Sequence, residues 1–465
     1  MRFRFAILML VAFLVSACAQ HRTAGRASRF DPPPHARLNA VAEAEMERQG
    51  IPGLAIVVMR DDALVLARGF GRESIARDDP VTPETVFQFN SISKQFLAAV
   101  VLQLAEEGRL SLDDPVSRHL PDWTRLPPGL TIRHLLSHTS GMREEFVQPH
   151  LMVLFARTGV AFAEYAAAAR TTPADFPPGS RWSYSNMNYL MLTLIVERAT
   201  GQALEIALEE RLFRPHGLAS IRLCPSPPGQ RSGGAAGHVE RDGRLVIHPP
   251  EPIHLFRGSG GYCGTALDLA RWSRALALGR VVSPASYALM TTPAPLNAGG
   301  AADYGLGLAL VAPDGVHRIG HGGYGGGFSA QAAYYPETRL TTVVIANRFI
   351  FAEHIERRIS RTLLGLDEPP TRDIPLSRAE RARFVGRFDV GIIDWHPRIE
   401  ECDGRLWFAL PDPRIELPLA YLGGGEFVSA DDPLGYRLSF SADGRELRLL
   451  GMGLMTWYGR RVETD

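Results

Sequence analysis

The sequence predicts an α+β protein in which an antiparallel sheet is flanked by helices, carries a helical insert and precedes a small C-terminal all-β, barrel-like domain. Two observations lead to this prediction. Strand-like runs lie at both ends of the segment 36–365, and helical periodicity fills much of the region between them. Beyond a proline-containing linker at 366–375, residues 376–465 contain short strand-like runs separated by turns.

The first elements of the main segment are a helix and a hairpin. Residues 36–49 have apolar side chains at helical spacing, followed by Gly50 as a stop signal. The β-runs 54–59 and 63–68 are joined at Asp61-Asp62 and predict a hairpin. A long apolar helix then starts at Ser91 and ends at Gly108.

The remainder of the main segment alternates between helical and strand character. Gly-rich and Pro-rich loops are expected at 225–261 because these residues interrupt regular structure. The further helices are expected at 132–137, 162–170, 189–199, 266–278 and 352–364, and the strands at 304–311, 317–320, 327–335 and 340–347.

The C-terminal domain is predicted from short strands and tight turns. The dipeptides Asp403-Gly404 and Asp443-Gly444 are hairpin signals. Its expected strands are 384–388, 398–401, 406–409, 415–420, 426–429, 436–441 and 446–450. Trp395, Trp407 and Trp457 are interpreted as core residues of this domain, one of which could reach a neighbouring site.

The N-terminus has the pattern of a secretory signal. A basic start is followed by an apolar run from Phe5 to Val15 and by small residues before Cys18. Val15-Ser16-Ala17-Cys18 resembles the lipobox of bacterial lipoproteins, so residues 1–18 are expected to be a lipoprotein-type signal with Cys18 as the lipidated residue and 19–35 as a tether. The alternative is an ordinary signal peptide cut near Ala19. Either predicts export, and the first predicts a lipid anchor on the periplasmic face of a bacterial membrane.

Charge and cysteine content exclude several classes of protein. The 465 residues carry 50 basic and 50 acidic side chains, so there is no cationic surplus for nucleic-acid binding. Cys224, Cys263 and Cys402 lie in no metal-ligand pattern; a bond between the first two is possible, and buried free thiols are favoured. No His-Glu-x-x-His or Gly-x-Ser-x-Gly motif is present, and no metal or other cofactor is expected.

Ser91 and Lys94 are the first candidate catalytic residues. Positions three apart lie on one face of a helix, so the lysine amine would lie beside the serine hydroxyl. Lys94 is the single lysine among the 50 basic residues, and the other 49 are arginine. Arginine stays protonated in proteins, whereas a buried lysine can act as a base. The use of lysine here therefore indicates a nucleophile and its base.

Two further motifs carry polar groups suited to the same chemistry. Tyr184-x-Asn186 places a phenol and an amide on a loop before a helix. Alone, these could be a packing tyrosine and a helix N-cap. His321-Gly322-Gly323-Tyr324 follows a strand-like run and leaves backbone N–H groups unobstructed, as an oxyanion site needs.

Together these motifs resemble those of the serine β-lactamase and penicillin-binding-protein superfamily, most closely its class C branch with the esterase and D-aminopeptidase relatives. The similarity extends over about residues 51–347. It includes the flanking stretches Ile51-Pro52-Gly53, Gly108 to Pro115, Leu135 to Gly141 and Gly260-Gly261-Tyr262.

The resemblance implies a role for each motif residue. Ser91 would attack a carbonyl, and Lys94 and Tyr184 would share its proton as a coupled pair. Asn186 would bind Lys94 and substrate. His321, Gly323 and Tyr324 would form the substrate-binding strand, with the backbone N–H groups of Ser91 and Tyr324 as the oxyanion site. Many relatives have Lys-Thr-Gly where this sequence has His321-Gly322-Gly323, so a fixed positive charge for a substrate carboxylate is missing and efficient β-lactamase action is not expected.

Three hypotheses for function follow. The first is an exported serine hydrolase that cleaves an ester or amide of a small molecule or short peptide through a Ser91 acyl-enzyme. The second is a D-Ala-D-Ala carboxypeptidase or weak β-lactamase, and the third a penicillin-recognising sensor or binding protein without turnover. His138 is interpreted as a packing residue, and Glu144 and Glu145 as solvent-facing loop residues.

Overall fold

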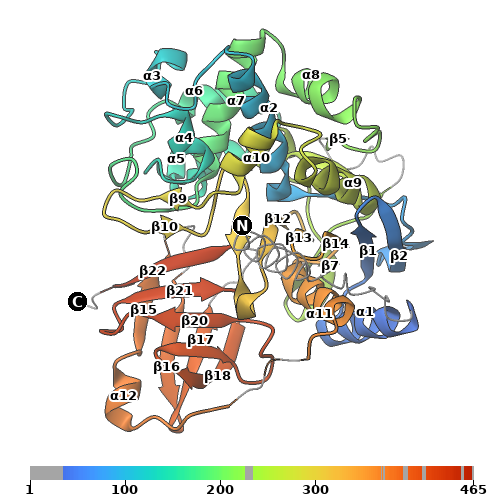
Figure 1. Cartoon of the computed structure of the whole chain (residues 1–465), viewed down its shortest axis with the longest axis vertical. Coiled ribbons are helices and arrows are strands. Elements are labelled where there is room, and N and C mark those ends of the chain that lie inside the picture. The colour runs from blue at the N-terminus through green and yellow to red at the C-terminus, as the bar shows by residue number, and fades with distance from the viewer. Residues whose placement is uncertain are drawn as a thin grey trace, which may run out of the picture. The chain divides into compact units, whose positions relative to one another are not determined.

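A computed structural model describes residues 35–225, 234–367, 369, 372–390, 396–410, 415–451 and 455–462. Its helices, labelled in Figure 1, are α1 His35–Gln49, α2 Lys94–Glu106, α3 Val116–His119, α4 Ile132–Leu136, α5 Pro149–Ala156, α6 Phe162–Ala169, α7 Asn186–Thr200, α8 Leu204–Leu208, α9 Ala266–Ala277, α10 Pro284–Met290, α11 Ala352–Leu364 and α12 Arg378–Ala382.

A seven-stranded antiparallel sheet forms the centre of the main segment, in the order β11-β12-β13-β14-β1-β2-β3. Strands from the two ends of this segment meet where β1 pairs with β14. The predicted α+β class is confirmed. The strands are β1 Gly53–Arg60, β2 Ala63–Ser74, β3 Arg77–Pro80, β11 Ala309–Val311, β12 Arg318–Gly325, β13 Phe328–Tyr335 and β14 Leu340–Ala346.

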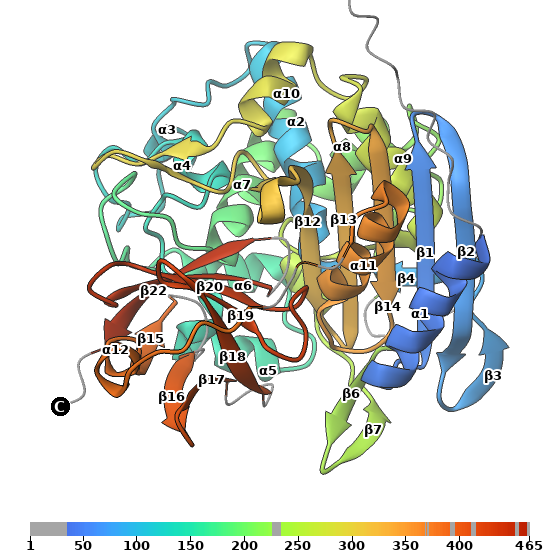
Figure 2. The same ribbon diagram turned by 60° about the horizontal axis from the view of Figure 1, so that its bottom comes forward.

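Helices cover both faces of this sheet (Figure 2). The helices α1 and α11 lie on one face and α9 on the other. Because both faces are covered, the central strands are almost continuously apolar; in β1, seven consecutive residues from Gly53 to Met59 are buried. The helix α2 is buried along nearly its whole length, which places its N-terminus in the protein interior beside β12.

The helical insert also contains small sheets. The strands β4 Val86–Gln88, β8 Tyr262–Thr265 and β5 Arg222–Leu223 form one sheet, and β9 Ala294–Pro295 pairs with β10 Ala301–Ala302. The hairpin of β6 His238–Arg241 and β7 Arg244–Ile247 lies within the stretch expected to be loop. Its turn residues Asp242 and Gly243 both have positive φ, as a tight hairpin turn requires.

The pairing of β5 with β8 corrects the expectation for the cysteines. Arg222 pairs with Cys263, which brings Cys224 and Cys263 to a Cα separation of 5.1 Å, and the two are joined in a disulfide. The preferred prediction of buried free thiols is therefore wrong for this pair, since the two cysteines are 39 positions apart and nothing in the sequence indicates that they pair. Cys402 is free and exposed rather than buried.

The strand predicted at 304–311 is only half correct. Gly305 N–H donates to the carbonyl of Leu308, and Gly307 has a φ of +75°. These residues form a tight turn, so only Ala309–Val311 continues as β11.

The C-terminal domain is a closed eight-stranded barrel, as the strand pattern predicted in outline. Its last strand was missed: residues 456–462 pair with both the first and the seventh barrel strands and so close the barrel. The glycine and two arginines of Thr456-Trp-Tyr-Gly-Arg-Arg-Val weaken its strand signal. The barrel strands are β15 Gly386–Asp389, β16 Arg398–Cys402, β17 Arg405–Leu410, β18 Ile415–Gly423, β19 Glu426–Ser429, β20 Arg437–Phe440, β21 Glu446–Leu450 and β22 Thr456–Val462.

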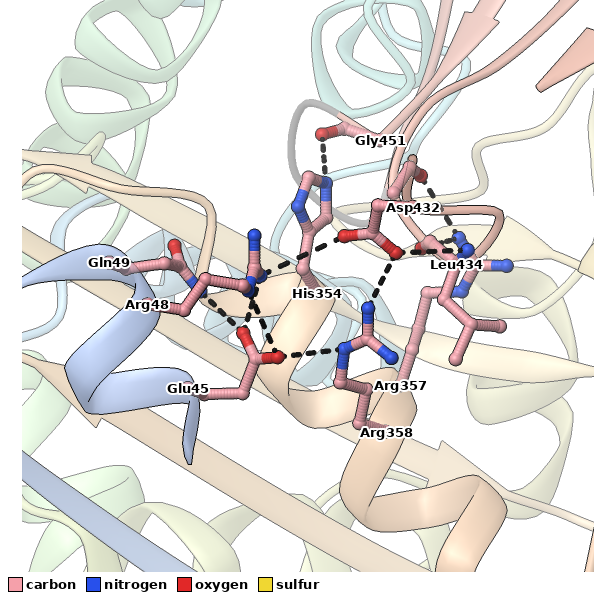
Figure 3. A network of polar contacts seen from close by, with 10 residues as sticks. Glu45, Arg48, Gln49, His354, Arg357, Arg358, Asp432, Leu434 and Gly451 are labelled. Atoms are coloured by element: carbon pink, nitrogen blue, oxygen red, sulfur yellow. Dashed lines mark hydrogen bonds and ion pairs between the residues drawn. The ribbon is translucent and has the colours of Figure 1, made fainter. Parts of the chain in front are cut away.

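A network of charged side chains connects the barrel with α1 and α11 (Figure 3). Arg358 of α11 lies 2.8 Å from Glu45 of α1 and 2.7 Å from Asp432 of the barrel. His354 Nε2 lies 2.9 Å from the carbonyl of Gly451. Burial lowers the pKa of His354 to about 4, so its ring is neutral near pH 7 and donates this hydrogen bond.

Several predictions concern residues outside those described: the signal segment 1–18 with Cys18, the tether apart from His35, which begins α1, and Trp395. The boundaries 36–365, 366–375 and 376–465 remain predictions. Within the described ranges, no helix combines the length and apolar character needed to cross a bilayer.

Candidate active site

Ser91 lies in a 3₁₀ turn, Asn90–Ser93, that runs directly into α2 at Lys94. Asn90 has a φ of +51°, a conformation that asparagine tolerates better than most residues. The side-chain NH₂ group of Asn90 donates to the carbonyl of Gly325 at 3.1 Å, and its side-chain Oδ1 accepts from the Gln88 amide at 2.6 Å. These contacts hold the turn that presents Ser91 against the end of β12.

Lys94 is completely buried, and its Nζ lies near three oxygen atoms. The distances are 2.7 Å to Asn186 Oδ1, 2.8 Å to the carbonyl of Ser259 and 3.2 Å to Ser91 Oγ. Burial lowers the pKa of Lys94 to about 7, although the carboxyl groups of Glu144 and Glu145 oppose this shift. A large fraction of the amine is therefore neutral at neutral pH.

In the neutral state, the two remaining hydrogens of Lys94 have obvious partners. The side-chain carbonyl of Asn186 and the backbone carbonyl of Ser259 can only accept, so each takes one hydrogen from Nζ. The nitrogen lone pair is then left for Ser91 Oγ. This arrangement can remove a proton from the serine hydroxyl.

Tyr184 completes the group around the serine. Its hydroxyl lies 2.9 Å from Ser91 Oγ, and Lys94 Nζ lies 4.7 Å from the centre of its ring. Burial raises the pKa of Tyr184 well above 10, so the phenol holds its proton at neutral pH. The structure thus places both Lys94 Nζ and the Tyr184 hydroxyl beside Ser91 Oγ, and their sharing of its proton stays a prediction.

Glu144 is buried, which corrects the expectation that it faces solvent. Its carboxylate accepts from the backbone N–H of Asn186 at 2.5 Å and from its side-chain amide at 2.9 Å. Since the NH₂ group of Asn186 donates to Glu144, the Oδ1 atom of Asn186 must face Lys94. No local sequence signal distinguishes this glutamate from a surface residue, because its partner is 42 positions away.

Glu145 is also buried, and the expectation for it was likewise wrong. Its carboxyl group accepts from the Tyr165 hydroxyl at 3.2 Å and has no contact with Asn186 among the hydrogen bonds found. Burial and the neighbouring Glu144 raise the pKa of Glu145 well above its ordinary value. The Glu145 carboxyl group therefore holds its proton more readily than an exposed glutamate does.

His138 packs behind Tyr184, as predicted, with 4.4 Å between the ring centres. Its Nδ1 accepts from the backbone N–H of Ser185 at 3.1 Å. Burial lowers the pKa of His138 well below its usual range, so the ring is neutral. The histidine supports the loop that carries Tyr184 and Asn186.

The strand β12 forms the other wall of the site. A side chain at Gly323 would lie 1.9 Å from the carbonyl of Phe89 and 3.0 Å from Ser91 N, so only glycine allows this approach. The Tyr324 ring packs on Phe351, 5.4 Å between centres, which leaves its backbone as the part available to the cleft. Within the described residues, β12 pairs with β11 only as far as Gly320, and residues 321–325 of β12 have no partner in β11.

His321 contributes neither a charge nor a free donor. The ring is buried, its Nδ1–H donates to the carbonyl of Gly322 at 2.5 Å, and its Nε2 accepts from the Tyr304 hydroxyl at 3.0 Å. Burial and Lys94 lower the pKa of His321 to about 3. Both ring nitrogens of His321 are thus already hydrogen-bonded within the protein, and the geometry does not support a direct contact of this side chain with substrate.

A small cavity of about 190 Å³ adjoins Ser91. It brings together residues of the Ser91 turn, the Asn186 helix and the end of β12. Its wall also contains residues that the motifs did not identify. The lining residues are Asn90, Ser91, Phe146, Phe155, Asn186, Glu251, Ile253, Phe256, Ser259, Gly260, Tyr324 and Gly325.

The barrel reaches this site through Trp457 of β22. The Trp457 ring centre lies 5.7 Å from that of Tyr184 and 5.9 Å from that of Trp182. Nearby, Asp303 accepts from Thr456 at 2.7 Å and from Arg448 at 2.6 Å. The barrel therefore packs directly behind the phenol that contacts Ser91.

Trp457→Ala is expected to lower kcat by roughly tenfold while KM changes less, since a small displacement of a catalytic group costs this much or more. Trp457→Phe should restore most of the rate. Trp407→Ala, which changes another tryptophan of the barrel, is the control for general loss of stability. Steady-state kinetics and thermal unfolding of the three variants test this, and equal losses in Trp457→Ala and Trp407→Ala would refute a role in positioning Tyr184.

In the part of the chain that the structure describes, no group of three or more His, Cys, Asp or Glu residues could hold a metal ion.

The fold and the group around Ser91 are those of the serine β-lactamase and penicillin-binding-protein class. The Beta-lactamase family model matches residues 38–366, and the chain belongs to this family. The resemblance inferred from the motifs is thus confirmed.

Two kinds of relative illustrate this membership. The chain is 29% identical over 319 residues to a D-aminopeptidase from Brucella anthropi, covering 68% of this chain and 60% of the relative. It therefore spans about three fifths of that protein's length. The octameric penicillin-binding protein homologue from Pyrococcus abyssi has the same fold, with a TM-score of 0.66 and 23% identity over 92% of this chain and 99% of that one.

A D-stereospecific amidohydrolase from Streptomyces sp. is similar to a smaller part of the chain. Its TM-score is 0.59 at 25% identity, and the match covers 71% of this chain and 98% of that one. More than a quarter of this chain thus has no counterpart in the amidohydrolase.

Proposed function

We propose that the protein is a serine amidohydrolase that removes an N-terminal D-amino acid from a short peptide or amide through a Ser91 acyl-enzyme. The observation that supports this most strongly is the buried Lys94 amine, whose Nζ lies 3.2 Å from Ser91 Oγ and within 2.8 Å of two carbonyl oxygens. The substrate class is supported by the D-aminopeptidase and D-stereospecific amidohydrolase relatives.

In the proposed reaction, neutral Lys94 takes the proton of Ser91 as Oγ bonds to the substrate carbonyl carbon. The carbonyl oxygen becomes an oxyanion held by the backbone N–H groups of Ser91 and Tyr324. Tyr184 then donates its proton to the leaving amine, the C–N bond breaks, and Lys94 returns a proton to Tyr184. Water enters and loses a proton to the Lys94 and Tyr184 pair as its oxygen bonds to the acyl carbon. The pair then returns this proton to Ser91 Oγ as the C–O bond breaks and the acid leaves.

The electrostatics at His321 make a carboxylate-bearing β-lactam a poor substrate. Its pKa of about 3 leaves the ring uncharged, so no fixed positive charge is available there. An amino-acid amide has an uncharged leaving group and needs no positive charge at this position. D-amino-acid amides therefore fit the site better than penicillins or cephalosporins.

Hydrolysis of D-alaninamide, L-alaninamide, a D-Ala-D-Ala peptide, a short p-nitrophenyl ester and nitrocefin by the wild type and by Ser91→Ala tests the proposal. The D-amide should be cleaved fastest, and Ser91→Ala should abolish the activity. Preferential cleavage of the D-Ala-D-Ala bond or of nitrocefin would instead identify the carboxypeptidase or β-lactamase alternative. Stoichiometric labelling without turnover would identify the sensor.

We also propose that the protein is exported and anchored through a lipid on Cys18, on the basis of the sequence pattern at residues 1–18. Mass spectrometry of the protein from native membranes should find lipidated Cys18 as the first residue. Recovery of a soluble form beginning at Ala19 or later would rule out the anchor.

A further inference from the structure

Glu251 and Ile253 line two neighbouring cavities. One is the 190 Å³ cavity at Ser91, and the other is a cavity of about 280 Å³ beside the Cys224–Cys263 disulfide. Because both residues contribute to both walls, they lie at the boundary between the two spaces. The Ser91 cavity is smaller than the 300–1,000 Å³ usual for larger ligands, so it is suited to one small residue.

The carboxyl group of Glu251 is the one acidic group among the residues that line the Ser91 cavity. Its side chain is 27% exposed. No arginine, lysine or histidine side chain lines this cavity in the described part of the protein. The Ser91 cavity, which would receive the acyl part of a substrate, is therefore lined by one ionisable carboxyl group and by no basic side chain.

The protein itself satisfies this carboxyl group only in part. His248 Nε2 is 3.5 Å from Glu251 Oε1, and His248 Nδ1 lies 2.6 Å from the carbonyl of Pro249, to which it must donate. At 3.5 Å, the contact between His248 and Glu251 is long for a hydrogen bond. Burial raises the pKa of Glu251, although His248 and the backbone N–H of Gly326 oppose this change. An additional cation would stabilise the ionised carboxylate.

Aromatic rings cover another part of the same cavity. Phe146, Phe155 and Phe256 lie with their ring centres 5.3 to 6.0 Å apart. They form an apolar wall, whereas Glu251 supplies the polar group. A bound residue with one positive charge and an apolar side chain matches both parts of the wall.

We propose that Glu251 binds the free α-ammonium group of the substrate's N-terminal residue, and that Glu251 and Ile253 together close the Ser91 cavity against N-terminally extended or acylated substrates. In a free amino-acid amide, the ammonium group is on the carbon next to the scissile carbonyl. A cavity that holds one residue must therefore bind that group within itself. This specificity rests on the proposed D-aminoacyl hydrolysis and makes the enzyme one that requires a free N-terminus.

The kinetic test compares D-alanine p-nitroanilide with N-acetyl-D-alanine p-nitroanilide. Glu251→Gln is expected to lower the ratio of the two kcat/KM values by about 10- to 100-fold, because the charged partner of the ammonium is lost. Glu240→Gln is the matched control: it removes a carboxylate from β6, in the same segment, that lines neither cavity. An unchanged ratio in Glu251→Gln would overturn the inference.

A binding test separates this inference from the proposed function. Calorimetry on Ser91→Ala should show that D-alaninamide binds more tightly than N-acetyl-D-alaninamide, and that adding Glu251→Gln removes this preference. If that result is found while the wild type hydrolyses no D-amino-acid amide, the ammonium site stands and the proposed reaction is wrong. If the wild type hydrolyses these amides and Ser91→Ala shows no Glu251-dependent preference, the reaction stands and the ammonium site is wrong.

Discussion

Lys94→Arg should reduce the rate at which an activated ester or amide acylates Ser91 by about 10²- to 10⁴-fold, the range expected when a general base is lost. The arginine keeps a positive charge but does not release its proton. A purely electrostatic or packing role for Lys94 would survive the change with a loss of a few-fold. The measurement is the acylation rate of the purified variant under single-turnover conditions.

The pH dependence of the wild type provides a second readout of the same role. Because the pKa of Lys94 is lowered to about 7, the base is mostly protonated at lower pH and mostly neutral at higher pH. The acylation rate should therefore rise with pH, reach half of its limit near pH 7 and level at higher pH. The apparent pKa belongs to the coupled Lys94 and Tyr184 pair.

A control is needed because Lys94 is completely buried and the guanidinium group is larger. Lys94→Met has a similar length, carries no charge and should lose acylation to the same extent. Circular dichroism and thermal unfolding show whether each variant is folded. Near-normal acylation by either folded variant would show that the lysine is not the base and would transfer that role to Tyr184.

Glu144→Gln is expected to lower kcat/KM by about 10²-fold and to reduce the free energy of unfolding. The carboxylate accepts two hydrogen bonds from Asn186, whereas glutamine has one oxygen and turns a second donor towards the other N–H. A buried donor left unsatisfied costs about 1–3 kcal/mol. Asn186 would then no longer be held with its Oδ1 towards Lys94.

Glu145→Gln is the matched control for this change. Glu145 is also buried, but its carboxyl group accepts from the Tyr165 hydroxyl, a hydrogen bond that a glutamine oxygen can also accept, so the rate should fall less than about threefold. Of the two carboxyl groups that raise the pKa of Lys94, Glu144 has the larger effect. Its removal should therefore shift the acidic limb of the pH–rate profile of Glu144→Gln to lower pH. Similar profiles for both variants would contradict an action of Glu144 through Asn186 and Lys94.

Much of the fold could be predicted because it depends on local periodicity. The apolar runs 54–59 and 340–347 identify central strands, and their burial on both faces explains why they lack polar alternation. The strand β22 could not be found in this way, since the short run that forms it contains a glycine and two arginines. Its place is determined by closure of the barrel against β15 and β21.

The sequence by itself determined the chemistry available at the site. The motifs identified four residues: Ser91, the single lysine three residues later, and Tyr184 and Asn186. In the structure, Ser91 contacts Lys94 and Tyr184, and Lys94 contacts Asn186, each at 3.2 Å or less. Ser91 and Lys94 stand out because the chain has no other lysine, whereas Tyr184 and Asn186 are recognised from the resemblance of all the motifs together to one family.

The tertiary structure decided how these groups are held and what surrounds them. The burial of Glu144, the Cys224–Cys263 bond, the contact of Trp457 with Tyr184 and the position of Glu251 between two cavities all depend on segments far apart in the sequence. Contacts of this kind have no period and no fixed spacing. They arise only when packing removes water from a group, and the same burial is what lowers the pKa of the one lysine to about 7.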